Sequence, residues 1–440
     1  MNVGVVMYQT SFTKGQELVA QRMARELARQ GHKAFLIAGP YHENKPIPEY
    51  DELERSVDGY LFFQKSEFQV PFIRVTGYVS TWPPRRIMFR NFLDVLRRLS
   101  DRFSLDVIIS HSTLWNGPEE ITKFVSWRRM LKHQGQDADI VAHCYMPHYQ
   151  PPDPVRYDIV ERTFRFTWNR MVFPQIHRTA NVILCTTPIE KYQMVAMGAR
   201  AKRCHLYPGG VDEEIFQKYG SEDPVYFLER YSIPANTKLV TYMGTLEERK
   251  NPIAVVRISK MLRKLEDVHF VLAGHPSNQH KQVLKEAKGL HNLSYVGAIS
   301  EKDKVALIRA SYVNILLSRM EALGLTQLEF MYGGVPIITS AVGGQRWLIR
   351  DCTDGIHVRG PDDLKGAAKA INTLVKNPTL RDELALNAKN RVKEFTLTRI
   401  TSDLSSRLMS LKTSQPFKLP IAFNRKMLKT FKGQEAHAVS

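Results

Sequence analysis

Two glutamates, Glu321 and Glu329, stand in one short segment whose pattern suits the binding of a polar ligand. Apolar runs of buried-strand length flank them at residues 312–317 and 335–339, and residues 325–332 place apolar side chains at helical spacing. The segment predicts a strand, a turn, a short helix and a second strand, the unit of a parallel α/β sheet. Ligands of such sheets bind at the carboxyl ends of strands, where the next helix begins. Glu321 falls in that turn.

Glu329 falls inside the predicted helix, among apolar neighbours, where a carboxylate needs a partner. Because an ionised carboxylate only accepts hydrogen bonds, it can hold two neighbouring hydroxyl groups of a ligand. The alternative is a structural ion pair with an arginine. The two interpretations differ in whether the partner of Glu329 belongs to a ligand or to the chain.

Two cations, Arg249 and Lys250, occupy the strand-to-helix turn that follows the apolar run at residues 239–244. Cations and helix amides that converge at such a turn are suited to a diphosphate. The alternative is a solvated turn whose charges face water.

Histidines end two further strands that the sequence predicts, at residues 106–111 and 139–143. A histidine at the carboxyl end of a parallel strand points into the ligand crevice, whereas a lone histidine elsewhere is usually structural. His143 is therefore the first candidate for a ligand contact, and His111 is the second.

The chain opens with a predicted strand at residues 2–8, a helix at 17–30 and a strand at 33–38. The loop between the first strand and the helix lacks the G-x-G-x-x-G pattern, which disfavours a nicotinamide enzyme. Gly15 alone lets the backbone come close to a ligand at the start of the helix.

The length, composition, net charge and cysteine content of the chain limit the class of protein to which it can belong. A chain of 440 residues fits two domains, and 43% hydrophobic with 24% charged residues is typical of a globular protein. The net charge of +18 calls for an anionic partner such as nucleic acid, an acidic membrane or a phosphorylated substrate, unless the enzyme is merely basic. Four scattered cysteines indicate neither disulfides nor a zinc site, which favours a reducing interior. We expect no signal peptide and no spanning helix.

Basic and aromatic residues alternate in three stretches, at residues 81–98, at 119–133 and in the tail from 412. These stretches predict contact with an anionic membrane surface. The alternative is a set of solvated faces whose long cationic side chains cover the protein's own apolar surface.

The spacing Glu321-x7-Glu329, with Gly324 between the glutamates and Gly-Gly-x-Pro after them, resembles the signature of the retaining glycosyltransferases of family four. This resemblance implies an α/β fold of the GT-B type, in which two Rossmann-like parallel-sheet domains face each other across a cleft. The turn at residues 208–216 is similar to the point at which the family's first domain passes to the second. We therefore predict an acceptor-binding domain at 1–212, a linker at 213–236, a nucleotide-sugar-binding domain at 237–396, and a crossover helix with a basic tail at 397–440.

The resemblance also implies roles for single residues. Glu329 would hold the ribose, Glu321 and the amides near Gly324 the sugar, and Lys250 with Arg249 the diphosphate. The family's usual arginine after the strand is replaced here by Thr245. The predicted catalytic residues are His143, Glu321 and Lys250, and the predicted donor-binding residues are Gly15, Arg249, Lys250, Gly274, Gly324, Leu325 and Glu329.

The prediction is a metal-independent glycosyltransferase that moves a sugar from a UDP-, GDP- or ADP-linked donor, with retention of configuration and no other cofactor. Its acceptor is a lipid-linked or phosphorylated molecule, a glycan or a small molecule. We expect the protein in the cytoplasm or peripherally at the inner membrane face, and we expect no nucleic acid. The alternatives are a nucleotide-sugar epimerase of the same fold and a non-catalytic basic protein that binds nucleic acid or membrane.

Overall fold

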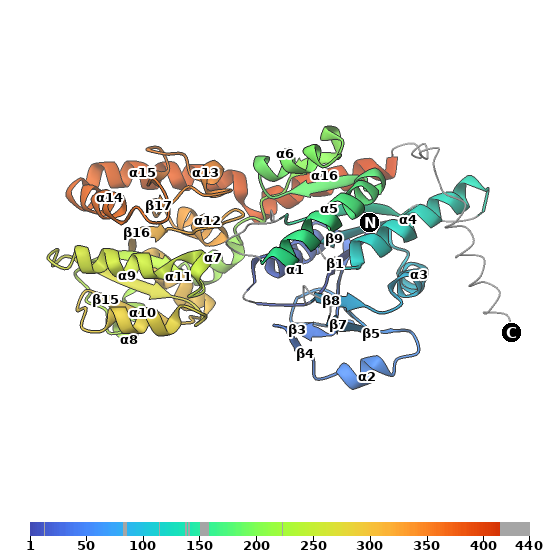
Figure 1. Cartoon of the computed structure of the whole chain (residues 1–440), viewed down its shortest axis with the longest axis horizontal. Coiled ribbons are helices and arrows are strands. Elements are labelled where there is room, and N and C mark those ends of the chain that lie inside the picture. Colours follow the sequence, from blue (N-terminus) through green and yellow to red (C-terminus); the bar gives the residue numbers. More distant parts are fainter. Residues whose placement is uncertain are drawn as a thin grey trace.

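The computed structural model describes residues 1–12, 14–81, 86–113, 115–136, 139, 141–149, 158–221 and 223–413. Two sheets, each with helices around it, lie side by side along the long axis of the molecule (Figure 1). This arrangement confirms the predicted α/β class with two parallel-sheet domains.

The first sheet has eight strands, and all its neighbouring pairs run parallel except β5 with β6. In spatial order the strands are β12 (Cys204–Leu206), β11 (Val182–Cys185), β10 (Ala142–Met146), β9 (Val107–His111), β1 (Asn2–Met7), β2 (Lys33–Ala38), β6 (Phe72–Val75) and β5 (Tyr60–Phe63). The helices of this domain are α1 (Gly15–Arg29), α2 (Tyr50–Glu54), α3 (Phe92–Phe103), α4 (Gly117–His133), α5 (Ile159–Thr179) and α6 (Pro188–Ala196). Two small hairpins add β3 (Tyr41–His42) with β4 (Lys45–Pro46), and β7 (Gly77–Ser80) with β8 (Arg86–Phe89).

The second sheet has six parallel strands. Their spatial order is β15 (Leu293–Gly297), β14 (Val268–Ala273), β13 (Lys238–Met243), β16 (Ser311–Leu316), β17 (Ile337–Thr339) and β18 (Gly355–His357). Its helices are α7 (Glu213–Tyr219), α8 (Val225–Arg230), α9 (Pro252–Met261), α10 (His280–Ala287), α11 (Glu301–Ala310), α12 (Leu325–Tyr332), α13 (Gln345–Leu348), α14 (Leu364–Lys376) and α15 (Pro378–Arg391).

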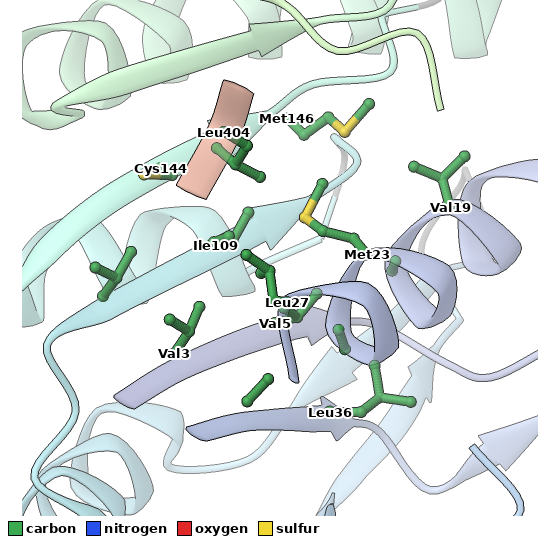
Figure 2. Packing of buried hydrophobic residues seen from close by; sticks show 14 of the residues in the cluster. Val3, Val5, Val19, Met23, Leu27, Leu36, Ile109, Cys144, Met146 and Leu404 are labelled. Carbon is green, nitrogen blue, oxygen red and sulfur yellow. The ribbon is translucent and has the colours of Figure 1, made fainter. Parts of the chain in front are cut away.

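The last helix, α16 (Leu397–Thr413), returns to the first domain. Leu404 lies in the same buried cluster as Val3 and Val5 of β1 and Leu27 of α1, as Figure 2 shows. The hydroxyl of Tyr207, which follows β12, lies 3.0 Å from that of Thr401. Because the apolar side of α16 completes the core of the first domain, the chain crosses between the domains twice.

One predicted strand is misplaced. The sequence predicted a strand at residues 139–143 that ends in histidine, whereas β10 runs from Ala142 to Met146 and pairs with β9 from Ala142↔Val107 to Met146↔His111. The apolar side chains of Cys144 and Met146 lie in the core, and this burial fixes the position of the strand.

Candidate functional site

Glu321 and Lys250 meet at the carboxyl end of the second sheet. Glu321 lies in the turn between β16 and α12, and Lys250 ends a short 3-10 helix (Glu248–Lys250) that follows β13. The Lys250 ammonium donates a hydrogen bond to Glu321 Oε2, and Arg249 Nη1 lies 3.9 Å from Glu321 Oε1. The structure therefore brings together three of the predicted site residues.

The charge of Glu321 depends on these cations. Burial by itself would raise the pKa of this carboxyl, but the charges of Lys250 and Arg249 and the hydrogen bond from Lys250 outweigh it and hold the pKa below its ordinary value. Glu321 is consequently ionised at neutral pH. An anion that attracts the Lys250 ammonium would therefore weaken the interaction on which the charge of Glu321 depends.

Two glycines, Gly343 and Gly344, allow a neighbouring loop to approach the backbone around Glu321 closely. A Cβ on Gly343 would lie 2.0 Å from the carbonyl oxygen of Glu321, and a Cβ on Gly344 would lie 1.9 Å from that of Ala322. The same Cβ on Gly344 would lie 2.8 Å from Thr187 Cγ2 in the first domain. Two loops of the second domain and one of the first therefore meet closely here.

The first turn of α12 faces the first domain. Gly324 caps this helix with a φ of 102°, a left-handed conformation that favours glycine. Leu325 packs against the cores of both domains, and a Cβ on Gly15 at the start of α1 would lie 3.5 Å from Leu325 Cδ1. The structure thus places the predicted residues Gly15, Gly324 and Leu325 together where the domains meet.

Glu329 is held by an ion pair on each side. Its Oε1 lies 3.0 Å from Lys304 Nζ on α11 and 3.4 Å from Arg22 Nη2 on α1, and all three residues are buried. Arg22 also lies 3.8 Å from Asp212, which pairs with Arg25. The ion-pair interpretation of Glu329 therefore applies in this structure, although both contacts use Oε1 and no described side chain pairs with Oε2. Its Arg22 contact joins the two domains.

The predicted position of His143 is wrong. The residue is the second of β10, and its fully buried ring accepts or donates a hydrogen bond at Nε2 with Ser110 Oγ at 2.8 Å. Burial lowers its pKa to about 3, with a smaller effect from Arg129. A ring inside the sheet cannot reach the carboxyl edge, because the last three residues of β10, Cys144–Met146, separate His143 from that edge.

Two other histidines occupy that edge. His111 ends β9, and His148 follows β10 by two residues; their rings stack with His111 Nδ1 3.1 Å from His148 Nε2. Burial lowers the pKa of His148 to about 3 and that of His111 well below its usual value. His111 Nε2 is buried without a hydrogen-bond partner. His148 was missed because the misplaced strand put its carboxyl end at His143, and its signal was a histidine just after the corrected strand.

Gly274 serves a structural purpose beside the site. A Cβ at this position would lie 1.9 Å from the carbonyl oxygen of Gly244, and its own carbonyl accepts a hydrogen bond of 3.0 Å from the Tyr295 hydroxyl. Gly274 lets the turns after β13 and β14 touch, so it shapes the edge on which Arg249 and Lys250 lie.

Neither a metal cluster nor a spanning helix is found among the described residues. No group of three or more His, Cys, Asp or Glu side chains in the described ranges is arranged to hold a metal ion. In the same part of the chain, no helix combines the length and the apolar character needed to cross a membrane.

Family models match both halves of the chain. Residues 13–215 match Glycosyltransferase Family 4, and residues 227–391 match Glycosyl transferases group 1. Together the two matches cover most of the chain and support a glycosyltransferase of group 1 and family 4, in agreement with the predicted family-four resemblance.

Two curated relatives illustrate the likeness in sequence. One is similar to this chain at 25% identity over 245 residues, 52% of this chain and 56% of the relative, and is the D-inositol 3-phosphate glycosyltransferase of Nocardiopsis dassonvillei. Another is a Campylobacter jejuni N-acetyl-D-galactosaminyltransferase whose name gives a PP-undecaprenol acceptor, 30% identical over 191 residues, 41% of this chain and 51% of the relative. The chain spans about half the length of these relatives.

Solved structures show the same fold. Sucrose-phosphate synthase from Thermosynechococcus elongatus superposes with a TM-score of 0.68 at 17% identity, over 94% of this chain and all of that chain (100%). Anabaena HepE in complex with UDP-glucose superposes with a TM-score of 0.65 at 16% identity, over 93% of this chain and 100% of its own. The two-domain architecture is therefore the GT-B fold.

Proposed function

We propose that this chain, which joins a glycosyltransferase family 4 domain to a glycosyl transferases group 1 domain, transfers a sugar from a nucleoside diphosphate sugar to an acceptor. The donor carries UDP, GDP or ADP, and the transfer retains the anomeric configuration. The donor binds to the second domain, and the acceptor binds to the first. No metal takes part, because Lys250 neutralises the diphosphate in place of one.

The pairing of Lys250 with Glu321 is the observation that carries this proposal. A diphosphate beside Lys250 and Arg249 would draw the ammonium away from Glu321 by charge. The freed carboxylate then accepts hydrogen bonds from hydroxyls of the sugar. As the bond to the sugar breaks, negative charge grows on the leaving diphosphate, and a lysine already placed beside it stabilises that charge.

Glu329 fits the ribose in the same scheme. Lys304 and Arg22 both pair with its Oε1, and two ribose hydroxyls are the ligand for which Oε2 is suited. Because Arg22 belongs to the first domain, donor binding and the closure of the two domains share this carboxylate.

His111 and His148 replace His143 as the residues that contact the sugar from the first domain. Both rings are buried and neutral at physiological pH, since burial depresses each pKa. A neutral imidazole can donate one hydrogen bond to a sugar hydroxyl without repelling Arg249 or Lys250. The stacked pair fixes the ring orientations before the donor arrives.

The acceptor carries phosphate in this proposal. The relatives' names include a phosphorylated inositol and a lipid-linked diphosphate as acceptors, and the net charge of +18 attracts both. The alternative, an epimerase that acts on the same donor, is not favoured by the matches to glycosyltransferase families.

Calorimetric titration of UDP-, GDP- and ADP-sugars into the purified chain tests the donor. We expect one nucleotide class to bind, and we expect binding to weaken in Lys250→Ala but not in Lys238→Ala, whose exposed lysine pairs with Asp267 at 2.6 Å. If none of the donors binds to the folded chain, the proposal is wrong.

The type of reaction is determined by analysing the products that form when the chain is incubated with the donor that it binds. Proton NMR of the transferred sugar shows whether the configuration is retained. Release of a free epimerised sugar nucleotide without any acceptor would favour the epimerase instead.

A further inference from the structure

The stretches from which the sequence predicted a membrane contact are largely engaged inside the protein. Phe89, Phe92 and Phe124 are buried in one core cluster, and the guanidinium of Arg97 lies 4.3 Å from the ring centre of Trp127. Residues 82–85 and the tail from 414 lie outside the described residues. The described parts of these stretches therefore leave little apolar surface for a bilayer.

Exposed apolar side chains gather on two other helices. Of the sixteen large hydrophobic residues exposed in the described chain, seven belong to α5 or α6. We call this set the α5–α6 face. Its members are Ile159, Val160, Phe166, Met171, Ile189, Tyr192 and Val195.

The amino-terminal half of α5 leaves Ile159, Val160 and Phe166 exposed, whereas the rings of Phe164 and Trp168 pack on the Arg86 guanidinium, each at 4.7 Å. None of residues 159–168 is buried, although five of these ten are large apolar residues. Ile159 is 68% exposed and Met171 is 65% exposed, whereas the carboxyl-terminal half buries Phe173 and Ile176 in the core. In the described part of the chain, α5 is therefore buried toward its carboxyl end and presents exposed apolar side chains to solvent toward its amino-terminal end.

Helix α6 presents its apolar residues from the same side of the sheet. β10, β11 and β12 are successive parallel neighbours, so right-handed crossovers place α5 and α6 on one face. Phe173 of α5 and Met194 of α6 share a buried cluster, and His177 Nδ1 lies 3.2 Å from the Met197 carbonyl oxygen. Tyr192 on α6 is 76% exposed.

The charge around this face is strongly positive. Residues 158–203 contain eight Lys and Arg against three Asp and Glu. All three acids are engaged, because Asp158 caps α5, Glu161 pairs with Arg165 at 2.7 Å, and Glu190 accepts from the Tyr149 amide. Exposed cations such as Arg170, whose guanidinium lies 4.6 Å from the Phe166 ring, are therefore left to meet an anionic surface.

We propose that the α5–α6 face docks the first domain on an anionic lipid bilayer, with its apolar side chains among the acyl chains and its cations at the headgroup phosphates. This combination of apolar and cationic side chains is what interfacial helices use. A second copy of the chain would bring the same positive charge to this face. The tail from 412 would do so too, with six Lys and Arg against one Glu.

The docking proposal rests on the proposed function. It also specifies where the acceptor comes from, namely the lipid bilayer. α5 follows the carboxyl end of β10, the edge at which His148 lies. An acceptor anchored in the leaflet would therefore reach the catalytic edge of the first domain from the side on which α5 begins. A chain docked in this way takes a lipid-anchored acceptor rather than a free phosphorylated one.

Vesicle co-sedimentation of the full chain tests the face. We expect binding to phosphatidylglycerol–phosphatidylcholine vesicles, little binding to phosphatidylcholine alone, and release by salt. The double variant Phe166→Ser with Met171→Ser should bind at least about tenfold more weakly. A matched variant of two exposed residues in the second domain, Met261→Ser with Leu386→Ser, should bind like the wild type.

Several outcomes would overturn the proposal. It is wrong if the wild type stays in the supernatant, if both double variants bind equally, or if deletion of residues 412–440 alone abolishes binding. A concentration-dependent dimer that the Phe166 and Met171 substitutions dissociate would assign the face to a second copy instead.

Calorimetry with the donor keeps the two proposals separate. The Phe166 and Met171 variant should retain donor affinity and its unfolding midpoint, because both side chains are exposed. If the wild-type chain binds no donor, the proposed function is wrong. If it binds donor but does not bind vesicles, only the docking surface is wrong.

Discussion

Replacing Lys250 by alanine tests whether this lysine binds the diphosphate of the donor or only pairs with Glu321. In the structure its ammonium bonds to Glu321, and the side chains of Lys250 and Glu321 are 15% and 9% exposed. Removal leaves a buried carboxylate with Arg249 as its nearest cation at 3.9 Å. The substitution therefore changes both stability and donor binding, and the two effects can be measured independently.

The stability effect follows from the buried charge. Removing one partner of a buried ion pair costs about 3–5 kcal/mol, and the remaining Arg249 reduces this to roughly 2–3 kcal/mol at pH 7. Because the folded-state pKa of Glu321 lies below its ordinary value, the pair stabilises the fold above the unfolded pKa. This contribution disappears as the pH falls through the folded pKa, so the difference between variant and wild type should narrow below about pH 4.

A double-mutant cycle separates the two roles. Lys250→Ala with Glu321→Gln removes the unpaired charge. We therefore expect the free energy of unfolding, measured by urea titration, to return to within about 1 kcal/mol of the wild-type value. Donor affinity should remain low in the double variant, because the diphosphate has lost its lysine and the sugar has lost the carboxylate of Glu321. Loss of a charged hydrogen bond predicts a Kd for the donor that is roughly 10- to 150-fold higher.

The exposed pair of Lys238 with Asp267 provides the control, since Lys238→Ala should change stability by less than about 1 kcal/mol and leave the donor Kd unchanged. If the double variant regains full donor affinity, Lys250 acts only as the partner of Glu321. If Lys250→Ala retains both stability and affinity, the charge argument itself is wrong.

Three further predictions concern the ribose, the metal and the histidines. Glu329→Gln should weaken donor binding by roughly 1–3 kcal/mol and also loosen the domain contact through Arg22, and calorimetry with urea titration measures both; unchanged affinity would remove the ribose role. Turnover should survive chelation with EDTA, whereas loss that magnesium or manganese restores would contradict the lysine clamp. Since burial lowers the pKa of His148 to about 3, activity should show no titration of this ring between about pH 5 and 8, where ordinary histidines change charge. A step in activity near about pH 6.5 that His148→Gln removes would show that the ring is charged in the reaction.

Local patterns in the sequence specified much of the second domain. Residues 325–332 were predicted as a helix, and α12 spans the same residues, because apolar spacing and Gly333 define both the buried side and the end. The turn that holds Lys250 was predicted from cations between a strand and a helix. Such features are visible in sequence since they depend on neighbours within a few residues.

The first domain shows where local patterns fail. Residues 139–146 contain apolar positions that are compatible with a strand in more than one place, and only pairing with β9 selects Ala142–Met146. Because β10 ends at Met146, the histidine near the carboxyl end of this strand is His148 and not His143. Strand position depends on which side chains fill a core assembled from distant segments, so sequence spacing could not decide it.

By itself the sequence determined the fold class, the strand–helix units and the residue types that meet at the carboxyl edge of the second sheet. Only the tertiary structure decided that Glu329 pairs with Arg22 and Lys304, that α16 completes the core of the first domain, and that α5 leaves several apolar side chains exposed. The physical reason is that helix propensity and apolar periodicity act between near neighbours. Ion pairs across 307 residues and the burial of a helix face depend on the packing of the whole chain.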